Sequence, residues 1–245
     1  MEIDRRTFLT LAGAGAAAAF PAGRLSAMPA APRPANVPSA IATLDLGNGC
    51  GLRESVAGFA SGLAELGMVA TSIRPGIDSD ARPRGLLVVP AVAVAGWPAS
   101  NLLIRRAARG DLCLVELGFG FGDGDLCTSG RFWLSQTLGL RAGTPARSPR
   151  VNGRPVPYVD YEWPVATKVR DFSRVIPLEG PGWTPMAWSG RSVVGLRRRM
   201  GAGSVVVLGS PIGPHLRSGD PEATEWLRAL VAEAAVHTPA QSFPV

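Results

Sequence analysis

A glutamate stands where an apolar run gives way to a series of glycines. The stretch GDLCLVELGFGFGDGD covers residues 110–125, and its apolar part leads directly into Glu116. A short apolar run bounded by glycines is typical of a buried strand of a parallel sheet, and ligands of open α/β sheets bind at the carboxyl ends of such strands. Glu116 could therefore act as a general acid or base, or anchor a ligand. It could equally accept hydrogen bonds from backbone amides and brace the turn, which is the role we favour.

Two other titratable residues are expected near Glu116. Asp45 lies near the end of the predicted first strand, and His215 is expected on a loop before the C-terminal helix. Glu116, Asp45 and His215 are therefore the candidate catalytic residues if the chain is an enzyme. No His/Cys cluster has zinc spacing, so we expect no metal site. The glycine run does not fit G-x-G-x-x-G and lacks the P-loop lysine, so we expect no cofactor either.

Aromatic side chains give a second candidate site. The segment YVDYEW, residues 158–163, mixes aromatic and acidic side chains. Aromatic platforms with polar rims suit a sugar, another small molecule or a protein partner, although ordinary sheet packing would need the same residues. With two residues of the glycine turn included, the predicted ligand contacts are Gly118, Phe119, Tyr158, Tyr161 and Trp163.

Composition excludes some classes of partner. The chain has 245 residues and a formal charge of +6, but its basic residues are scattered and accompany no nucleic-acid-binding motif, so we expect no nucleic-acid partner. Beyond the N-terminus, no apolar run approaches the roughly 18 residues of a membrane span. We therefore expect no membrane span in the mature chain.

The N-terminus has the pattern of a twin-arginine signal. Arg5 and Arg6 precede Phe8-Leu9 and a weakly apolar stretch rich in Ala and Gly. We predict a signal peptide over residues 1–27, recognised by the twin-arginine translocase, and a periplasmic or otherwise exported mature protein. A linker over residues 28–39, one domain over residues 40–237 and a tail over residues 238–245 would follow.

The predicted elements of the domain follow the rhythm of an α/β protein. The pattern of strand, helix, strand, strand, helix, strand up to Glu116 is typical of a parallel sheet. After the glycine turn we expect a helix, a loop, short antiparallel strands over residues 157–178, a strand pair around Gly201–Gly203 and a final helix. The expected strands are 41–46, 68–73, 86–90, 112–116, 192–198 and 204–208, and the expected helices are 52–66, 101–108, 131–138 and one that opens at 220–221.

Three stretches, residues 85–98, 106–121 and 201–215, resemble the class I glutamine amidotransferase-like superfamily. The resemblance implies a flavodoxin-like architecture: a doubly wound, mainly parallel sheet with helices on both faces. The family's Cys-x-Gly elbow corresponds here to Glu116-Leu117-Gly118, Cys113 lies inside the strand, and His215 is displaced from the position of the family's histidine. The resemblance therefore implies a pseudoenzyme that binds or scaffolds. The alternative is a hydrolase with a rebuilt site of Glu116, Asp45 and His215.

The resemblance also implies a disulfide. In the amidotransferase-like strand order, the strands before Cys50 and Cys127 are neighbours, so both cysteines would lie at one rim of the sheet. An oxidising compartment would then favour a Cys50–Cys127 bridge. Two unpaired thiols in separate loops are the alternative.

Overall fold

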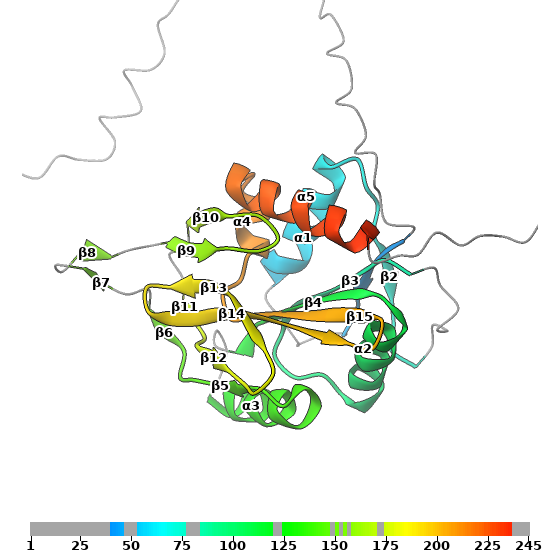
Figure 1. The fold of residues 1–245 in the computed structure, drawn as a ribbon, viewed down its shortest axis with the longest axis horizontal. Coiled ribbons are helices and arrows are strands. Elements are labelled where there is room, and N and C mark those ends of the chain that lie inside the picture. The colour runs from blue at the N-terminus through cyan, green and yellow to red at the C-terminus, as the bar shows by residue number, and fades with distance from the viewer. Residues whose placement is uncertain are drawn as a thin grey trace, which may run out of the picture. The chain divides into compact units, whose positions relative to one another are not determined.

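One nine-stranded sheet organises the part of the chain that the structure describes (Figure 1). The computed structural model describes residues 40–46, 53–76, 84–119, 124–147, 150–151, 154–155, 158–170 and 174–236. These residues fall within one compact unit, Arg33–Val245. The predicted signal peptide lies outside the described residues and stays a prediction. None of the described helices is both long enough and apolar enough to cross a membrane.

The strands of the large sheet run in the order β10-β9-β13-β14-β15-β4-β3-β1-β2. From β2 to β15 the four neighbouring pairs are parallel. From β15 to β10 the four neighbouring pairs are antiparallel. The strands of this sheet are β1 (Ile41–Leu44), β2 (Thr71–Ile73), β3 (Leu86–Val92), β4 (Leu112–Leu117), β9 (Tyr158–Tyr161), β10 (Thr167–Arg170), β13 (Thr184–Ser189), β14 (Ser192–Met200) and β15 (Gly203–Leu208).

Because half of its strand pairs are antiparallel, the sheet is mixed, and the prediction of a mainly parallel, flavodoxin-like sheet is wrong. The apolar strands β3, β4 and β15 carry the parallel pattern that the sequence suggested. The short strands after residue 157, however, continue the same sheet and do not stand apart from it.

Three small two-stranded sheets accompany the large sheet, formed by β5 (Arg141–Ala142) with β12 (Leu178–Glu179), β6 (Ala146–Arg147) with β11 (Arg174–Val175), and β7 (Arg150–Val151) with β8 (Arg154–Pro155).

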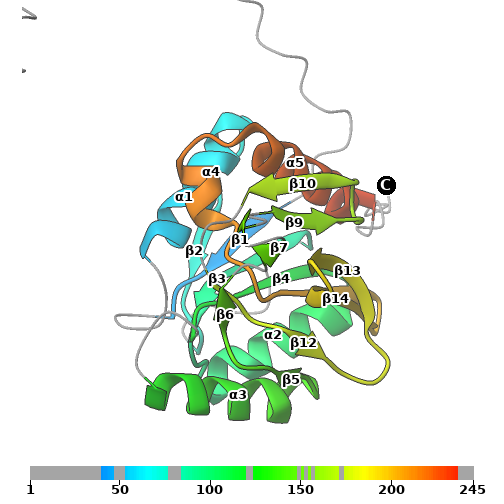
Figure 2. The ribbon, with the colours of Figure 1, turned by 90° about the vertical axis from the view of Figure 1, so that its left-hand side faces the viewer.

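Helices cover the two faces of the sheet (Figure 2). Along β4 alternate side chains point to opposite faces, as the pleat requires: Leu112 and Leu114 belong to one apolar cluster, and Cys113 and Val115 to the other. The first cluster packs against α1, α4 and α5, and the second against α2 and α3. The helices are α1 (Arg53–Glu65), α2 (Trp97–Arg109), α3 (Gly124–Leu138), α4 (Gly213–Arg217) and α5 (Pro221–Val236).

The ends of several elements differ from the sequence prediction. Helix α3 begins at Gly124 and not at residue 131, so part of the expected glycine turn is helical. Helix α2 begins at Trp97, and Pro98 follows in its first turn. A backbone N–H at that position would have no acceptor within the helix, so a proline there loses no hydrogen bond. The short helix α4 takes in His215, which was expected on a loop.

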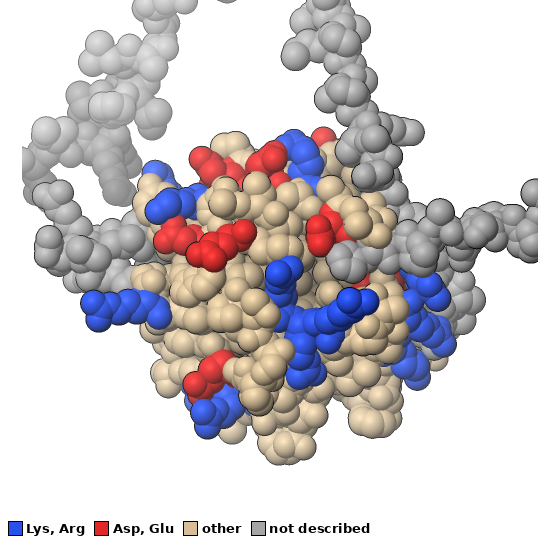
Figure 3. Space-filling view, viewed as in Figure 1, with Lys and Arg blue, Asp and Glu red and all other residues tan. Residues whose placement is uncertain are grey.

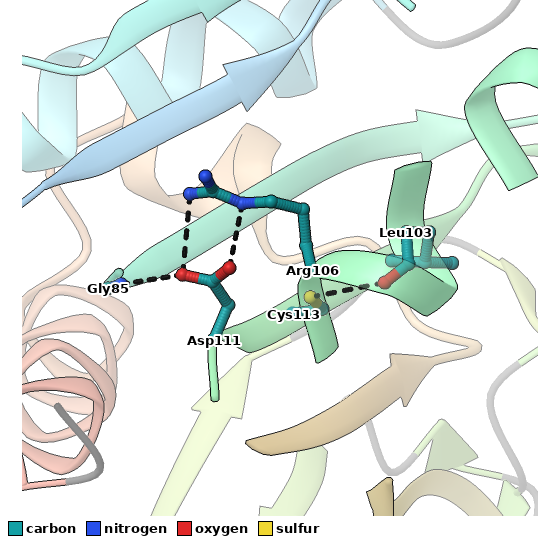
Figure 4. Close-up of polar contacts among 5 residues, drawn as sticks. All are labelled: Gly85, Leu103, Arg106, Asp111 and Cys113. Carbon is teal, nitrogen blue, oxygen red and sulfur yellow. Dashed lines mark hydrogen bonds and ion pairs between the residues drawn. The ribbon is translucent and has the colours of Figure 1, made fainter. Parts of the chain in front are cut away.

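A buried ion pair joins the end of α2 to the starts of two central strands (Figure 4). Arg106 Nε lies 2.7 Å from Asp111 Oδ2, and the Gly85 N–H donates to Asp111 Oδ1 at 2.6 Å. Burial raises the pKa of Asp111, and the Arg106 guanidinium opposes that rise. The neighbouring Cys113 is fully buried with its thiol 3.8 Å from the Leu103 carbonyl oxygen, as expected of a cysteine that packs as a small apolar side chain.

Removing the carboxylate of this pair should destabilise the fold strongly. Asp111→Asn leaves the Arg106 charge buried without its counter-ion, a situation that costs about 3–5 kcal/mol. The free energy of unfolding, measured in urea at pH 7, should fall by that amount with an unchanged denaturant slope. The control is Glu179→Gln, which breaks the Arg141–Glu179 pair, whose side chains are 79% and 67% exposed. That change should cost no more than about 1 kcal/mol, and equal losses in the two variants would contradict a stabilising role for the buried pair.

Candidate functional site

The side chain of Glu116 is fully buried at the carboxyl end of β4 and bridges two other segments. Its Oε2 accepts a hydrogen bond from the Ala91 N–H at 2.9 Å, and its Oε1 accepts one from the Gly213 N–H at 2.8 Å. Ala91 belongs to the neighbouring strand β3, and Gly213 begins α4. Both oxygens of Glu116 are therefore occupied by backbone donors.

Backbone packs tightly around Glu116. A Cβ atom added to Gly58 of α1 would collide with the Gly213 carbonyl, and one added to Gly118 would collide with the Ala91 carbonyl. The Ser55 hydroxyl of α1 is buried and faces the carboxylate closely enough to lower its pKa, but outside hydrogen-bonding geometry. Glycines at these places let α1, α4 and the strand ends approach one another directly.

Glu116 also holds a strained part of β3. Ala91 has φ of +40°, an uncommon conformation for a residue with a Cβ atom, and the pairing of β3 with β4 is irregular between Val89 and Val92. The hydrogen bond from the Ala91 N–H to Glu116 satisfies a donor that the bulge turns away from the regular ladder. The strained backbone therefore lies opposite Glu116, on β3, and is tied to it.

Burial is the dominant influence on the charge of Glu116. It raises the pKa of the carboxyl group above its ordinary value, and nearby backbone N–H groups, first that of Gly213, together with the close Ser55 hydroxyl, oppose that rise. A group with a raised pKa at a strand end would suit a general acid. Here, however, no described cavity opens onto it.

Of the three candidate catalytic residues, only Asp45 lines one of the cavities described in the structure. Asp45 pairs with Arg74 at 3.3 Å, with its side chain 37% exposed, beside a cavity of about 520 Å³ between β1, α1 and β2. Neither Glu116 nor His215 lines that cavity. His215 lies in α4, where its N–H donates to the Ile212 carbonyl at 3.0 Å.

The predicted ligand contacts are used mainly for packing. Phe119 and Tyr161 are buried, and the Tyr161 ring packs at 5.1 Å against Trp226 of α5. Trp163 is partly buried, accepts a hydrogen bond on its carbonyl from Trp226 Nε1 at 3.0 Å, and is covered by the guanidinium of Arg197.

The other two predicted ligand contacts also bind neighbouring strands. Tyr158 accepts a hydrogen bond from Arg170 on the neighbouring strand. Gly118 donates its N–H to the Val92 carbonyl at 2.7 Å and, as described above, packs closely against Ala91.

Basic side chains gather where Arg197 lies. Figure 3 shows a group of Lys and Arg side chains near the middle of the drawn face, over the β14–β15 hairpin. A cavity of about 280 Å³ there is lined by Arg197, Arg198 and Arg199 together with Glu233 of α5. Arg197 and Arg198 stack on Trp163 and Trp183, with guanidinium-to-ring distances of 5.0 and 4.8 Å. Two of these three arginines therefore take part in packing of the sheet surface.

Sequence reasoning missed a groove between α2 and α3. The groove, of about 750 Å³, is lined by two strongly exposed aromatic side chains, Trp97 and Phe132. Phe132 was expected inside a helix and Trp97 in a loop. Each of them lies on the face of its helix that points away from the core. The helical periodicity of apolar residues is the signal that could have identified both side chains as exposed.

One predicted pair of residues lies partly outside the described chain. Cys127 lies half-buried inside α3, and not in a loop as expected, and β3 lies between the two strands that were expected to be neighbours, β1 and β4. Cys50 lies outside the described residues, so the Cys50–Cys127 bridge stays a prediction.

No family model and no curated protein sequence matches the chain. Solved structures do share its fold. An exo-β-1,4-mannosidase from Opitutaceae bacterium strain TAV5 is 14% identical, with a TM-score of 0.53 over 85% of this chain and 37% of its own. A β-galactosidase from Rahnella sp. R3 is 14% identical, with a TM-score of 0.57 over 83% of this chain and 32% of its own. An α-L-fucosidase isoenzyme from Paenibacillus thiaminolyticus is 12% identical, with a TM-score of 0.51 over 84% of this chain and 33% of its own.

These similarities correct the expected family. The chain shares its fold with part of several glycoside hydrolases and spans about a third of their length. The prediction of an amidotransferase-like pseudoenzyme is therefore wrong. The three stretches that suggested it are a glycine-rich strand end and two apolar strands with their flanking loops, and many α/β proteins carry such segments.

Glu116→Gln should destabilise the protein, although the change is nearly isosteric. Glutamine has one acceptor oxygen, so its amide group would face either the Ala91 or the Gly213 N–H and leave a buried donor without a partner. We expect a loss of about 1–3 kcal/mol in the free energy of unfolding, measured in urea. The control is Glu225→Gln on α5, where the carboxylate is exposed and paired with Arg228 one turn along the helix.

The penalty of Glu116→Gln should also depend on pH. Because the pKa of Glu116 is raised in the folded protein, the folded state keeps a proton that the unfolded state releases above the ordinary value of 4.5. The free energy of unfolding of the wild type therefore falls as pH rises above 4.5. The glutamine variant has no proton to release at this position, so it lacks that pH dependence. The difference between the two proteins should be largest below pH 4.5 and shrink above it. A difference that grows with pH would mean that Glu116 is ionised and stabilised by its donors.

Proposed function

We propose that this chain is an exported carbohydrate-directed domain that acts by binding glycans. A mannosidase, a β-galactosidase and an α-L-fucosidase contain a region of the same fold, and their names supply the class of ligand. The observation that favours binding over cleavage is the environment of Glu116. Both oxygens of the carboxylate at the strand end already accept backbone hydrogen bonds, from Ala91 and Gly213, so neither is free to act on a scissile bond.

Cleavage is the second candidate function. The activities named for the three similar structures favour it, because all three are glycoside hydrolases. Asp45 is the candidate carboxylate that a substrate could reach, since it is exposed beside the 520 Å³ cavity. Glycoside hydrolysis ordinarily needs two carboxyl groups that flank the bond, roughly 5–10 Å apart. A rebuilt site would have to bring Glu116 to Asp45, with His215 as a further acid–base group.

The two functions can be separated with the purified full-length chain. Binding is measured by affinity electrophoresis and calorimetry with β-1,4-mannan, β-galactan and their oligosaccharides. Cleavage is measured by release of nitrophenol from aryl β-mannoside, β-galactoside and α-L-fucoside. We expect at least one glycan to bind, and no nitrophenol release above that of a heat-denatured sample.

Asp45→Asn serves as the matched control. If cleavage occurs and is lost in this variant, the chain is a hydrolase and the binding proposal is wrong. If wild type neither binds a glycan nor cleaves a glycoside, a carbohydrate-directed function is contradicted. Folding of each protein is checked by its urea transition.

Export is part of the same proposal and rests on the N-terminal sequence. Changing both Arg5 and Arg6 to Lys should abolish appearance of the protein in the periplasm, because the translocase reads the arginine pair. Fractionation followed by immunoblotting measures this, and mass spectrometry of the exported protein locates the cleavage site. Normal export of the double variant would show that the pair is no signal.

A further inference from the structure

The groove between α2 and α3 lies on the opposite side of the sheet from Glu116. Figure 2 shows the two helices next to each other, on the far side from α1, α4 and α5. Residues 94 and 95, in the segment that follows β3, close one side of the groove. Its volume of about 750 Å³ is within the range of small-molecule sites. Glu116 does not line this groove.

Two exposed aromatic rings line this groove. Trp97 is 77% exposed and Phe132 is 68% exposed, and they are the aromatic residues among the large apolar side chains that stand out as exposed in the described chain. They come from different helices, α2 and α3. Exposed aromatic rings that meet in one concave surface mark an interaction site more often than a single exposed ring does.

The polar part of the groove is partly preorganised. Ser100 accepts a hydrogen bond from Trp133 Nε1 at 2.8 Å and donates to the Gly96 carbonyl at 3.2 Å, which fixes the base of the groove. Asn101 and Gln136 contribute amide groups, which can both donate and accept hydrogen bonds. The ligand therefore meets rings together with neutral hydrogen-bonding groups.

The groove is also uncharged. Its described lining contains no Asp, Glu, Lys or Arg, although the chain carries a formal charge of +6. A charged ligand would leave water for a surface without a counter-ion, which is unfavourable. A neutral ligand with apolar faces and many hydroxyl groups matches both the rings and the amides. Pyranose rings have this chemistry.

We infer that the α2–α3 groove is a binding site for a neutral oligosaccharide, with Trp97 and Phe132 as stacking platforms. The inference rests on the proposed glycan-binding function and names its site.

The test compares Trp97→Ala, Phe132→Ala and the double variant with wild type. Binding of β-1,4-mannooligosaccharides and β-galactooligosaccharides is measured by calorimetry with the full-length proteins. We expect each single change to weaken binding about tenfold and the double change to abolish it, since an aromatic anchor contributes roughly that much. Because both side chains are exposed, the variants should keep the wild-type urea transition. Val69→Ala, which removes an 89% exposed side chain beside the other cavity, should bind as wild type does.

Three results would overturn the inference, and they can be told apart. If wild type binds a sugar and the groove variants bind it equally well, the site lies elsewhere and the proposed function survives. If wild type binds no sugar, the proposed function fails first. If wild type self-associates in analytical ultracentrifugation and Trp97→Ala makes it monomeric, the groove is an interface between copies of the chain.

Discussion

The structure depends on one buried carboxylate that replaces missing backbone partners. Glu116 binds the N–H groups of Ala91 and Gly213, and thereby connects β4, the bulge of β3 and the start of α4. Neither donor lies in a regular ladder, so without the carboxylate each would be buried and unsatisfied. The glycines at positions 58, 118 and 213 then allow the backbone to close over it. The carboxyl end of β4 is thus held together by hydrogen bonds to one side chain and by close backbone packing.

The sequence predicted the parts of this arrangement that local patterns determine. Apolar runs marked β3, β4 and β15, the helix expected over residues 52–66 is α1, and the bracing role favoured for Glu116 agrees with its hydrogen bonds. The number of antiparallel strands in the sheet could not be predicted, because strand partners separated by tens of residues leave no local signal. The family was predicted wrongly for a related reason. Glycines at a strand end indicate that backbone segments pack closely there, but they do not indicate which reaction or ligand the site serves.

The candidate ligand residues show the same division. Tyr161 and Trp163 are aromatic residues among acids, a composition that fits either a binding platform or a sheet packed under a helix, and their contacts with Trp226 place them in the packing. Trp97 and Phe132 lie on separate helices, 35 positions apart in the printed sequence, so only the tertiary structure places them on one groove. Helix-face periodicity could identify each as outward-facing, but not that they face a shared hollow.

The position of β4 in the sheet has a consequence for the order in which the protein folds. All six residues of β4 are buried, and one edge of the strand pairs with β3, which precedes it by about twenty residues. The other edge pairs with β15, where Leu208 lies opposite Glu116, so it waits for some ninety residues of chain before it finds a partner. Until β15 is made, the growing polypeptide exposes one unpaired edge of the apolar strand β4. Exposed strand edges of this kind can pair with those of other chains and cause aggregation. A chain that stops before Gly203 would keep this edge open permanently. The central sheet is therefore closed only when its last strand, β15, is made, and chaperone dependence should be concentrated in the interval between the synthesis of β4 and that of β15.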